Sequence, residues 1–212
     1  MHQVPNASPT AASASSEMYG SAVLDACKQM KARMEPIASK HTFACKCMLH
    51  VANRPLCTWN FFIKPDIGFD WGTGNGNPFS YFTIGVAFSK VEIDTLTGDF
   101  NRRRADVIMD LGFSINPAID VGQIEGAFVQ GLGWFALEEL KWGDAAHKWV
   151  PAGCLYSCGP GSYKISSVND VPFNFNVSLL KGAPNDKAIH SSKGIPEPPI
   201  CLASSVIFAI KD

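Results

Sequence analysis

The chain has 212 residues, a mass of 22.9 kDa and a formal charge of −1, and 46% of its residues are hydrophobic. The low charged fraction of 17% excludes an intrinsically disordered chain, and the near-neutral balance gives no electrostatic basis for a nucleic acid or membrane partner. No apolar run reaches the ~18 residues needed to span a bilayer, no signal peptide is visible, and the seven cysteines are odd in number, so we expect a cytoplasmic protein.

The first predicted element is an amphipathic helix from Glu17 to about Ala38. Residues 1–16 are rich in Ser, Ala, Thr and Pro and predict an extended entry segment. Apolar side chains then recur every three or four positions, which is helical spacing. The pair Glu35-Pro36 predicts the end of this helix, because proline disfavours a helical residue before it.

The middle of the chain predicts a loop and then a β-hairpin. Residues 68–78 hold four glycines and predict a long loop. Apolar residues alternate along 82–88, which predicts a strand with this set of side chains buried, and a return strand follows over 105–111. The alternation changes phase after Phe88, so we expect a β-bulge near Ser89-Lys90.

The clearest helical pattern covers residues 120–140. One face carries an apolar stripe, and another carries Gln123, Gly126, Gln130 and Gly133. Each glycine inside a helix costs about 1 kcal/mol relative to alanine, so close approach of a backbone or a ligand is expected there. Ordinary helix packing and ligand binding both remain open from this pattern alone.

The C-terminal part predicts a strand over 173–179, a Gly/Pro-rich turn over 193–199 and a helix over 200–210. Strands and helices are therefore mixed along the chain, and the fold class expected is α+β, with mixed sheets and packed helices. The last helix reaches Asp212 without a stop signal, which is typical of a fragment.

Glu197 is the titratable residue whose surroundings are most unusual. It lies between prolines in the string IPEPP, which restricts the backbone on both sides. Apolar neighbours would desolvate the carboxylate and suit it to general-base catalysis. The other interpretation is a solvated carboxylate at a helix N-terminus.

Two further patterns offer weaker candidates. The Ser/Thr-rich residues 8–16 lie directly before a helix and could bind an anion through backbone N–H groups, or Ser15 or Ser16 could simply cap the helix. The cysteine pairs Cys45/Cys47 and Cys154/Cys158 lack zinc-site spacing, and we interpret them as incidental thiols.

Five strings together resemble one family, the molybdenum hydroxylases related to xanthine dehydrogenase. They are PNASPTAAS at 5–13, VEIDTLTGD at 91–99, MDLGFSINPAID at 109–120, GQIEGAFVQGLG at 122–133 and EPP at 197–199. The amino-acid sequence from Trp134 to Trp142 is most similar to that of the plant enzymes. The resemblance covers residues 1–212 except for a divergent stretch at 41–62, and it corresponds to the C-terminal part of the family's molybdenum-cofactor-binding domain.

The resemblance implies a reaction and a set of cofactors. Enzymes of this family hydroxylate a ring carbon of hypoxanthine or xanthine, ending in urate, with a molybdenum–molybdopterin cofactor and a glutamate general base. Electrons leave through 2Fe-2S clusters and FAD to NAD. The full-length family is homodimeric, and its FAD and 2Fe-2S domains have no counterpart in this chain.

The resemblance also assigns site residues. It places the catalytic general base at Glu197 and a pterin-binding amide at Gln123. It places the loop that closes over the molybdenum at 11–13, with Ala12 nearest the metal without a side-chain bond to it. Further pterin or phosphate contacts fall on Thr10, Ala11, Ser13 and Ser15. Pro196 stands where the family usually has glycine, so we expect the carboxylate to be aimed differently.

Two alternatives to an active xanthine dehydrogenase fragment are open. The isolated chain could be a catalytically silent remnant that binds a partner, because residues that hold the substrate lie upstream in the family. Aldehyde oxidase shares the cofactor and the glutamate. The Trp134 to Trp142 string favours xanthine dehydrogenase.

Overall fold

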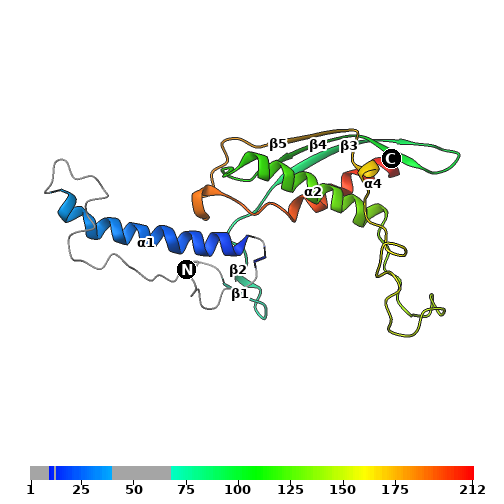
Figure 1. Ribbon diagram of the computed structural model, residues 1–212, viewed down its shortest axis with the longest axis horizontal. Helices are drawn as coiled ribbons and strands as arrows, with labels where there is room; N and C mark the ends of the chain where they lie inside the picture. The colour runs from blue at the N-terminus through cyan, green and yellow to red at the C-terminus, as the bar shows by residue number, and fades with distance from the viewer. Residues whose placement is uncertain (1–9, 12, 40–67) are drawn as a thin grey trace. The chain divides into compact units, whose positions relative to one another are not determined.

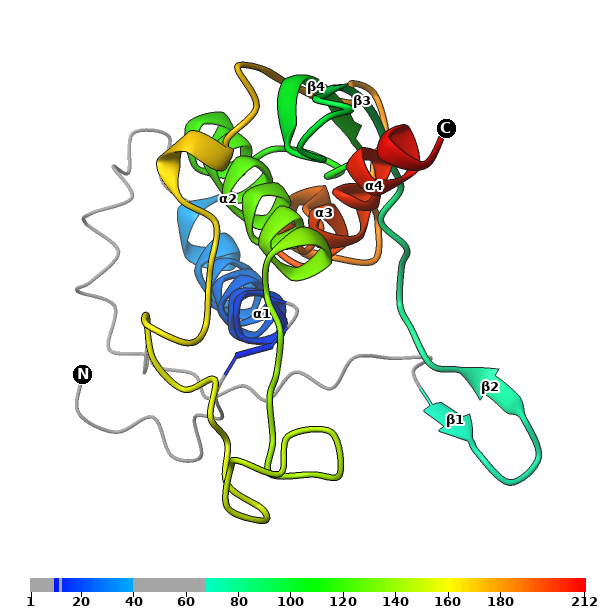
Figure 2. The same cartoon turned by 90° about the vertical axis from the view of Figure 1, so that its right-hand side faces the viewer.

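The structure is a computed structural model that describes residues 10–11, 13–39 and 68–212 (Figures 1 and 2). It divides into two compact units, which we describe separately. The first comprises residues up to Ser80 together with Asp186–Ile189, and the second comprises Tyr81–Asn185 with His190–Asp212. The divergent stretch 41–62 and the Cys45/Cys47 pair lie outside the described residues.

The first unit contains the predicted N-terminal helix, α1, which runs from Ala14 to Ala38. The predicted end near Ala38 is confirmed, and Pro36 lies inside the last turn, two residues before that end. The backbone N–H of Ser39 donates to the carbonyl of Glu35 at 2.9 Å and closes the last turn. Pro36 lacks an N–H and so costs the helix one hydrogen bond, to the carbonyl of Ala32, while the Ser39 bond keeps the last turn closed.

A small antiparallel ribbon replaces the loop expected over 68–78. Strands β1 (Gly68–Asp70) and β2 (Asn75–Asn77) pair across a tight turn. The Asp70 carboxylate holds this turn by accepting from the N–H of Gly72 at 2.9 Å and the hydroxyl of Thr73 at 2.8 Å. The left-handed backbone of Gly74 (φ 69°) completes it. The glycines mark a turn inside a hairpin.

The second unit is built on a three-stranded sheet of order β3-β4-β5. Strand β3 (Gly85–Ile93) pairs antiparallel with β4 (Phe100–Met109), and β4 pairs parallel with β5 (Asn174–Leu179). The predicted bulge is confirmed at Lys90/Val91, where the register shifts. The additional residue is Arg103 of β4, because Lys90 pairs with Arg104 and Val91 with Arg102.

The buried face of β3 is opposite to the one predicted. Phe82, Ile84, Val86 and Phe88 are all exposed, Phe88 to 64%, whereas Ala87, Ser89 and Val91 face the core. The helices approach β3 so closely that only small side chains fit: a Cβ on Gly85 would lie 2.9 Å from Leu202. The buried Ser89 hydroxyl is satisfied by the Ser205 hydroxyl at 2.7 Å.

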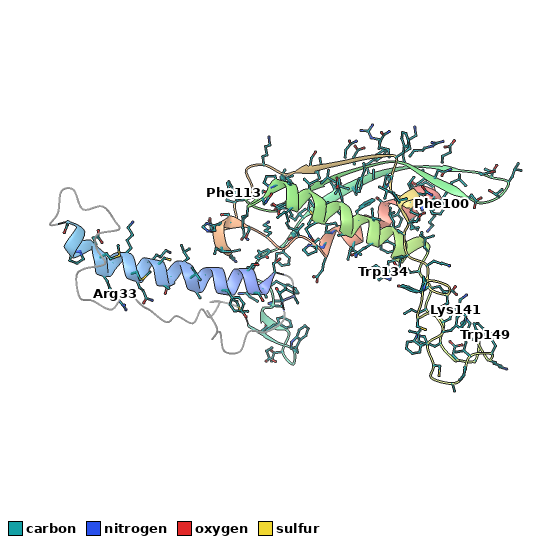
Figure 3. The ribbon with its side chains drawn as sticks, viewed as in Figure 1. Arg33, Phe100, Phe113, Trp134, Lys141 and Trp149 are labelled. Carbon is teal, nitrogen blue, oxygen red and sulfur yellow. The ribbon has the colours of Figure 1, made fainter. Side chains whose placement is uncertain are left out.

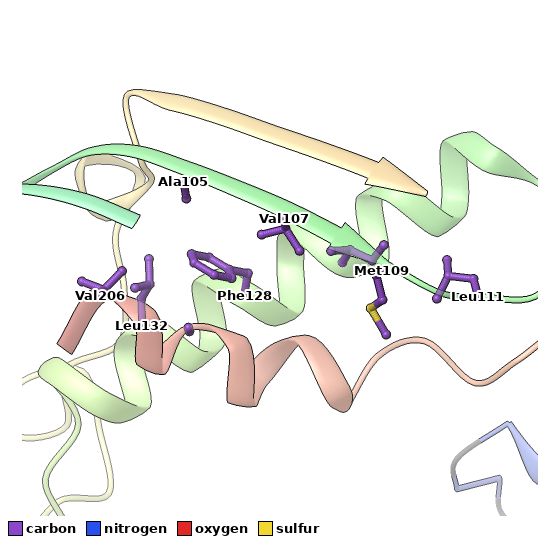
Figure 4. Packing of buried hydrophobic residues seen from close by; sticks show 9 residues of the cluster. Ala105, Val107, Met109, Leu111, Phe128, Leu132 and Val206 are labelled. Carbon is purple, nitrogen blue, oxygen red and sulfur yellow. The ribbon is translucent and has the colours of Figure 1, made fainter. Parts of the chain in front are cut away.

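Three helices cover the inner face of the sheet (Figure 4): α2 (Pro117–Ala136), α3 (Pro198–Leu202) and α4 (Ser204–Lys211). Helix α2 begins earlier than predicted because the Asn116 side chain caps it and Pro117 starts it. The predicted stripe is confirmed in part, since Ile124, Phe128 and Leu132 are buried and Phe135 is 38% exposed. The core also includes Ala105, Val107, Met109, Leu111, Ala203 and Val206.

The arrangement confirms the α+β class, with a mixed sheet and helices on one of its faces (Figures 1 and 4). The predicted strand near 173–179 is β5, whose Phe175, Val177 and Leu179 pack on the core. The predicted C-terminal helix is split into α3 and α4 at the buried Ala203. Among the helices described, none is long and apolar enough to cross a membrane.

Candidate functional site

Glu197 lies at the N-cap position of α3, directly before Pro198. Its carbonyl accepts from the N–H of Ile200 at 3.1 Å, but its side chain makes no capping bond. Glu197 is exposed, so within the described part of the chain the expected desolvation by apolar neighbours is not present. Its backbone direction is nevertheless fixed, because prolines restrict φ on both sides. The backbone at Glu197 is therefore restricted, and its exposed carboxylate is open to a ligand.

The Gln/Gly face of α2 is partly open and partly packed. Gln123, Gly126 and Gln130 are exposed, and a Cβ on Gly126 would meet nothing within 4 Å. Gly133 is buried, and a Cβ there would lie 2.6 Å from the Glu138 carboxylate. The first half of this face therefore leaves room for a ligand or another backbone, and the last turn is explained by packing.

The closest helix approach occurs at Gly131, which the sequence interpretation did not single out. A Cβ at this position would lie 2.5 Å from the backbone oxygen of Ile200 in α3. Helices α2 and α3 run side by side in the same direction (Figure 4). Glu197 precedes Ile200, and Gln123 precedes Gly131. The carboxylate and the amide therefore lie toward the same end of this helix pair.

The third predicted component, residues 10–15, belongs to the first unit. Thr10 caps the start of α1, because its hydroxyl oxygen accepts from the N–H of Ser15 at 3.3 Å. Ser13 has a left-handed backbone (φ 62°), uncommon for a residue other than glycine. Ser15 and Ser16 lie inside the first turn, so the prediction that either caps the helix is wrong. Ala12 lies outside the described residues.

A surface hollow of about 500 Å³ lies beside the second half of α2. Gln130, Trp134, Glu138 and Tyr163 line it, and Figure 3 shows Trp134 at this end of the helix. The Tyr163 hydroxyl donates to the Glu138 carboxylate, and this bond holds the pKa of the tyrosine above its ordinary value. No local pattern in the sequence indicates this pair, because Tyr163 and Glu138 are 25 residues apart in the chain.

The described residues contain no cluster of three His, Cys, Asp or Glu side chains that could bind a metal ion. Cys154 and Cys158 are exposed free thiols, as are Cys27 and Cys201.

Comparison with known proteins identifies the family. The model of the molybdopterin cofactor-binding domain matches residues 1–172. The chain belongs to this family. It is 68% identical over 218 aligned residues to xanthine dehydrogenase 1 of Arabidopsis thaliana and 64% identical to xanthine dehydrogenase of Oryza sativa subsp. japonica. Each match covers 99% of this chain but 16% of the relative, so the chain spans about a sixth of the length of these enzymes.

A solved structure supports the same assignment. Aldehyde oxidoreductase from Desulfovibrio gigas matches 98% of this chain with a TM-score of 0.74 and 26% identity. The match covers 22% of that enzyme. Both comparisons confirm the predicted family, and in each of them the chain matches only part of the longer enzyme.

Proposed function

We propose that this chain supplies the C-terminal wall of the molybdenum site in a xanthine dehydrogenase. The supporting observation is that Glu197 and Gln123 both precede the Gly131–Ile200 contact in their helices, and that both are exposed and lack a side-chain hydrogen bond among the described residues. The relatives of highest listed identity carry the name xanthine dehydrogenase, which favours this activity over aldehyde oxidase.

The residues present fit a molybdenum–molybdopterin cofactor. A pterin presents amide-like donors and acceptors, which the Gln123 amide matches, and the open space at Gly126 leaves room for the ring system. By the family resemblance, Thr10, Ala11, Ser13 and Ser15 would offer backbone and hydroxyl groups to the pterin or its phosphate, and Ala12 would be nearest the metal. When bound, this cofactor supplies the two-electron oxidation that no amino-acid side chain provides.

Glu197 acts as the general base in this proposal. Its carboxylate takes a proton as the oxygen nucleophile forms and returns it to solvent as the product leaves. The flanking prolines reduce the conformational freedom that a flexible carboxylate would lose on reaching the reacting geometry. Water must be excluded for the base to be effective, and the parts of the enzyme that this chain does not span would close the site.

The remaining partners follow from the same proposal. The substrate is a purine such as hypoxanthine or xanthine, the electron acceptors are 2Fe-2S clusters and FAD, and the final acceptor is NAD. The whole enzyme is a cytoplasmic homodimer. The 2Fe-2S clusters, FAD and NAD bind regions of the enzyme outside the sixth that this chain represents.

A chimeric enzyme tests the proposal. The matching sixth of Arabidopsis thaliana xanthine dehydrogenase 1 is replaced by this chain, and urate formation from xanthine and molybdenum content are measured. The chimera is expected to bind molybdenum and form urate, whereas the 212-residue chain alone forms none. A folded chimera that binds molybdenum but oxidises only aldehydes would contradict the assignment of the substrate.

One observation favours a silent fragment when the chain is expressed alone. The outer face of β3 presents Val86 and Phe88, beside the exposed Ile108 of β4. A contiguous apolar face of this kind usually contacts another protein surface. The isolated chain would then associate without catalysing any reaction.

A further inference from the structure

The turn that leads to Glu197 is held by a lysine with two anchors. The Nζ atom of Lys193 lies 2.5 Å from the Asp110 carboxylate and donates to the carbonyl of Phe82 at 2.9 Å. The side chains of Lys193 and Asp110 are only 10% and 9% exposed. This ion pair therefore joins the end of β4 to the turn and to the segment before β3, largely shielded from water.

Backbone hydrogen bonds reinforce the same junction. The N–H of Lys193 donates to the carbonyl of Leu111 at 3.1 Å, and the N–H of Gly194 donates to the Tyr81 hydroxyl at 2.9 Å. The second oxygen of Asp110 accepts from the N–H of Gly112 at 2.8 Å. Both oxygens of Asp110 are therefore hydrogen-bonded. The position of the carboxylate is fixed, and it fixes the position of the Lys193 ammonium group in turn.

Few rotations separate this junction from the glutamate. Ile195 packs against the core cluster, which fixes the residue after Gly194. Only Pro196 then lies between Ile195 and Glu197, and Pro198 follows. Since Pro196 and Pro198 each have a fixed φ, the path of the backbone through Glu197 depends on where Lys193 is anchored.

We propose that Lys193 and Asp110 are positioning residues that hold Glu197 in its reacting geometry. This inference rests on the proposed function, in which Glu197 is the general base. A buried ion pair adds little net stability compared with an apolar pair of the same shape, but it fixes geometry through directed hydrogen bonds. The Lys193–Asp110 ion pair therefore acts mainly by fixing the position of the turn that leads to Glu197.

The double variant Lys193→Met/Asp110→Asn tests this in the chimeric enzyme, because it removes the ion pair without leaving an unpaired buried charge. We expect kcat to fall about tenfold or more with KM nearly unchanged, since a small displacement of a catalytic group slows the reaction strongly. Molybdenum content is expected to stay at the level of the unmodified chimera. Lys141→Met is the matched control, because it removes the partner of Glu139 from an exposed ion pair elsewhere.

A second readout does not depend on activity. In the 212-residue chain, the amides of Lys193 and Gly194 are expected to exchange hydrogen about tenfold faster in the double variant than in the Lys141→Met control. Should the double variant fail to fold, Tyr81→Phe removes the hydroxyl that accepts the Gly194 bond and leaves the ion pair in place. A smaller rise in exchange at Gly194 with a smaller fall in kcat is then expected.

Two results would overturn the inference. One is that the double variant with full molybdenum content, or the Tyr81→Phe variant, has the same kcat as the unmodified chimera. The other is unchanged exchange at Lys193 and Gly194. Failure of the proposed function is distinguished by Glu197→Gln: if that variant retains full turnover, Glu197 is not the base, whereas the exchange measurement still reports whether the ion pair fixes the turn.

Discussion

Gly131 in α2 and Ile200 in α3 mark the closest contact between the two helices that carry the proposed site. The backbone oxygen of Ile200 lies 2.5 Å from where a Cβ of residue 131 would be, and the Ala203 side chain lies 2.7 Å from it. The helices are in backbone contact at this point. The position of Glu197, three residues before Ile200, is thereby tied to α2.

This contact predicts opposite effects for two glycine substitutions in one helix. Gly131→Ala is expected to destabilise the chain by about 1–3 kcal/mol, because the added methyl must push α3 away. Gly126→Ala, with nothing within 4 Å, is expected to stabilise it by up to about 1 kcal/mol through helix propensity. Urea unfolding of the two variants measures both. Equal effects would mean that α3 does not pack against Gly131.

The position of the core predicts the effect of removing aromatic side chains. Phe128 is fully buried, with its ring centroid 5.2 Å from that of Phe175, so Phe128→Ala is expected to cost ~3–5 kcal/mol of unfolding free energy. Phe88→Ala, on the exposed face of β3, is expected to cost much less. A larger loss from Phe88→Ala would show that the sheet buries the face that the apolar alternation first indicated.

An acid-sensitive ion pair joins β4 to the segment before β5. Burial of Asp170 opposes its ionisation, but hydrogen bonds from Ser167 and the Arg102 guanidinium at 2.5 Å prevail and lower the pKa of this carboxyl. A lowered folded-state pKa contributes stability above the unfolded value of ~3.9 and loses it as the pH falls through the folded value. The urea midpoint should therefore fall more steeply below pH 4 in the unmodified chain than in Asp170→Asn. An equal fall of the urea midpoint with pH in the unmodified chain and in Asp170→Asn would contradict this. Asp99→Asn in the hairpin turn is the control, and it should keep the steep fall of the unmodified chain.

The exposed face of β3 predicts association of the isolated chain. Ile84 is 70% exposed and Phe88 64%, and β3 is an edge strand of its sheet. We expect the 212-residue chain to form concentration-dependent oligomers, and Ile84→Ser/Phe88→Ser to reduce their size in sedimentation measurements. Leu96→Ser, in the turn after β3, is a control that removes one exposed apolar side chain outside this face. If the unmodified chain is monomeric at all concentrations, the exposed face of β3 does not mediate association.

Much of the fold follows from local patterns in the sequence. The long apolar stripe of α2 was visible as a helical period, and the Gly98 turn (φ 81°) as a flexible residue. The bulge was predicted close to its place, but its additional residue is Arg103 of β4, and β3 itself keeps an unbroken alternation of Ala87, Ser89 and Val91 toward the core. The parallel pairing of β4 with β5 was not visible, because those strands are separated by 64 residues and no local signal encodes their register.

The buried face of β3 shows where pattern reasoning fails. Alternation identifies two faces but not which of them meets the helices. In this sheet the close approach of Leu202 and Ser205 selects the small residues Gly85 and Ser89, and the large apolar side chains point outward. That choice depends on tertiary packing, which a single strand cannot report.

The candidate site divides in the same way. Glu197 was visible from the prolines beside it and Gln123 from the helical spacing of polar and small residues. The Lys193–Asp110 ion pair was invisible, because its members lie 83 residues apart. Gly131 was missed because it stands one step away from the Gln/Gly series, on the side that α3 covers.

The turnover of the Glu197→Gln variant of the chimeric enzyme tests directly whether Glu197 is the general base. The amide keeps the size of the side chain but cannot take a proton. We expect kcat for urate formation to fall by ~10²-fold or more, with molybdenum content unchanged. Turnover equal to that of the unmodified chimera at equal molybdenum content would contradict the claim.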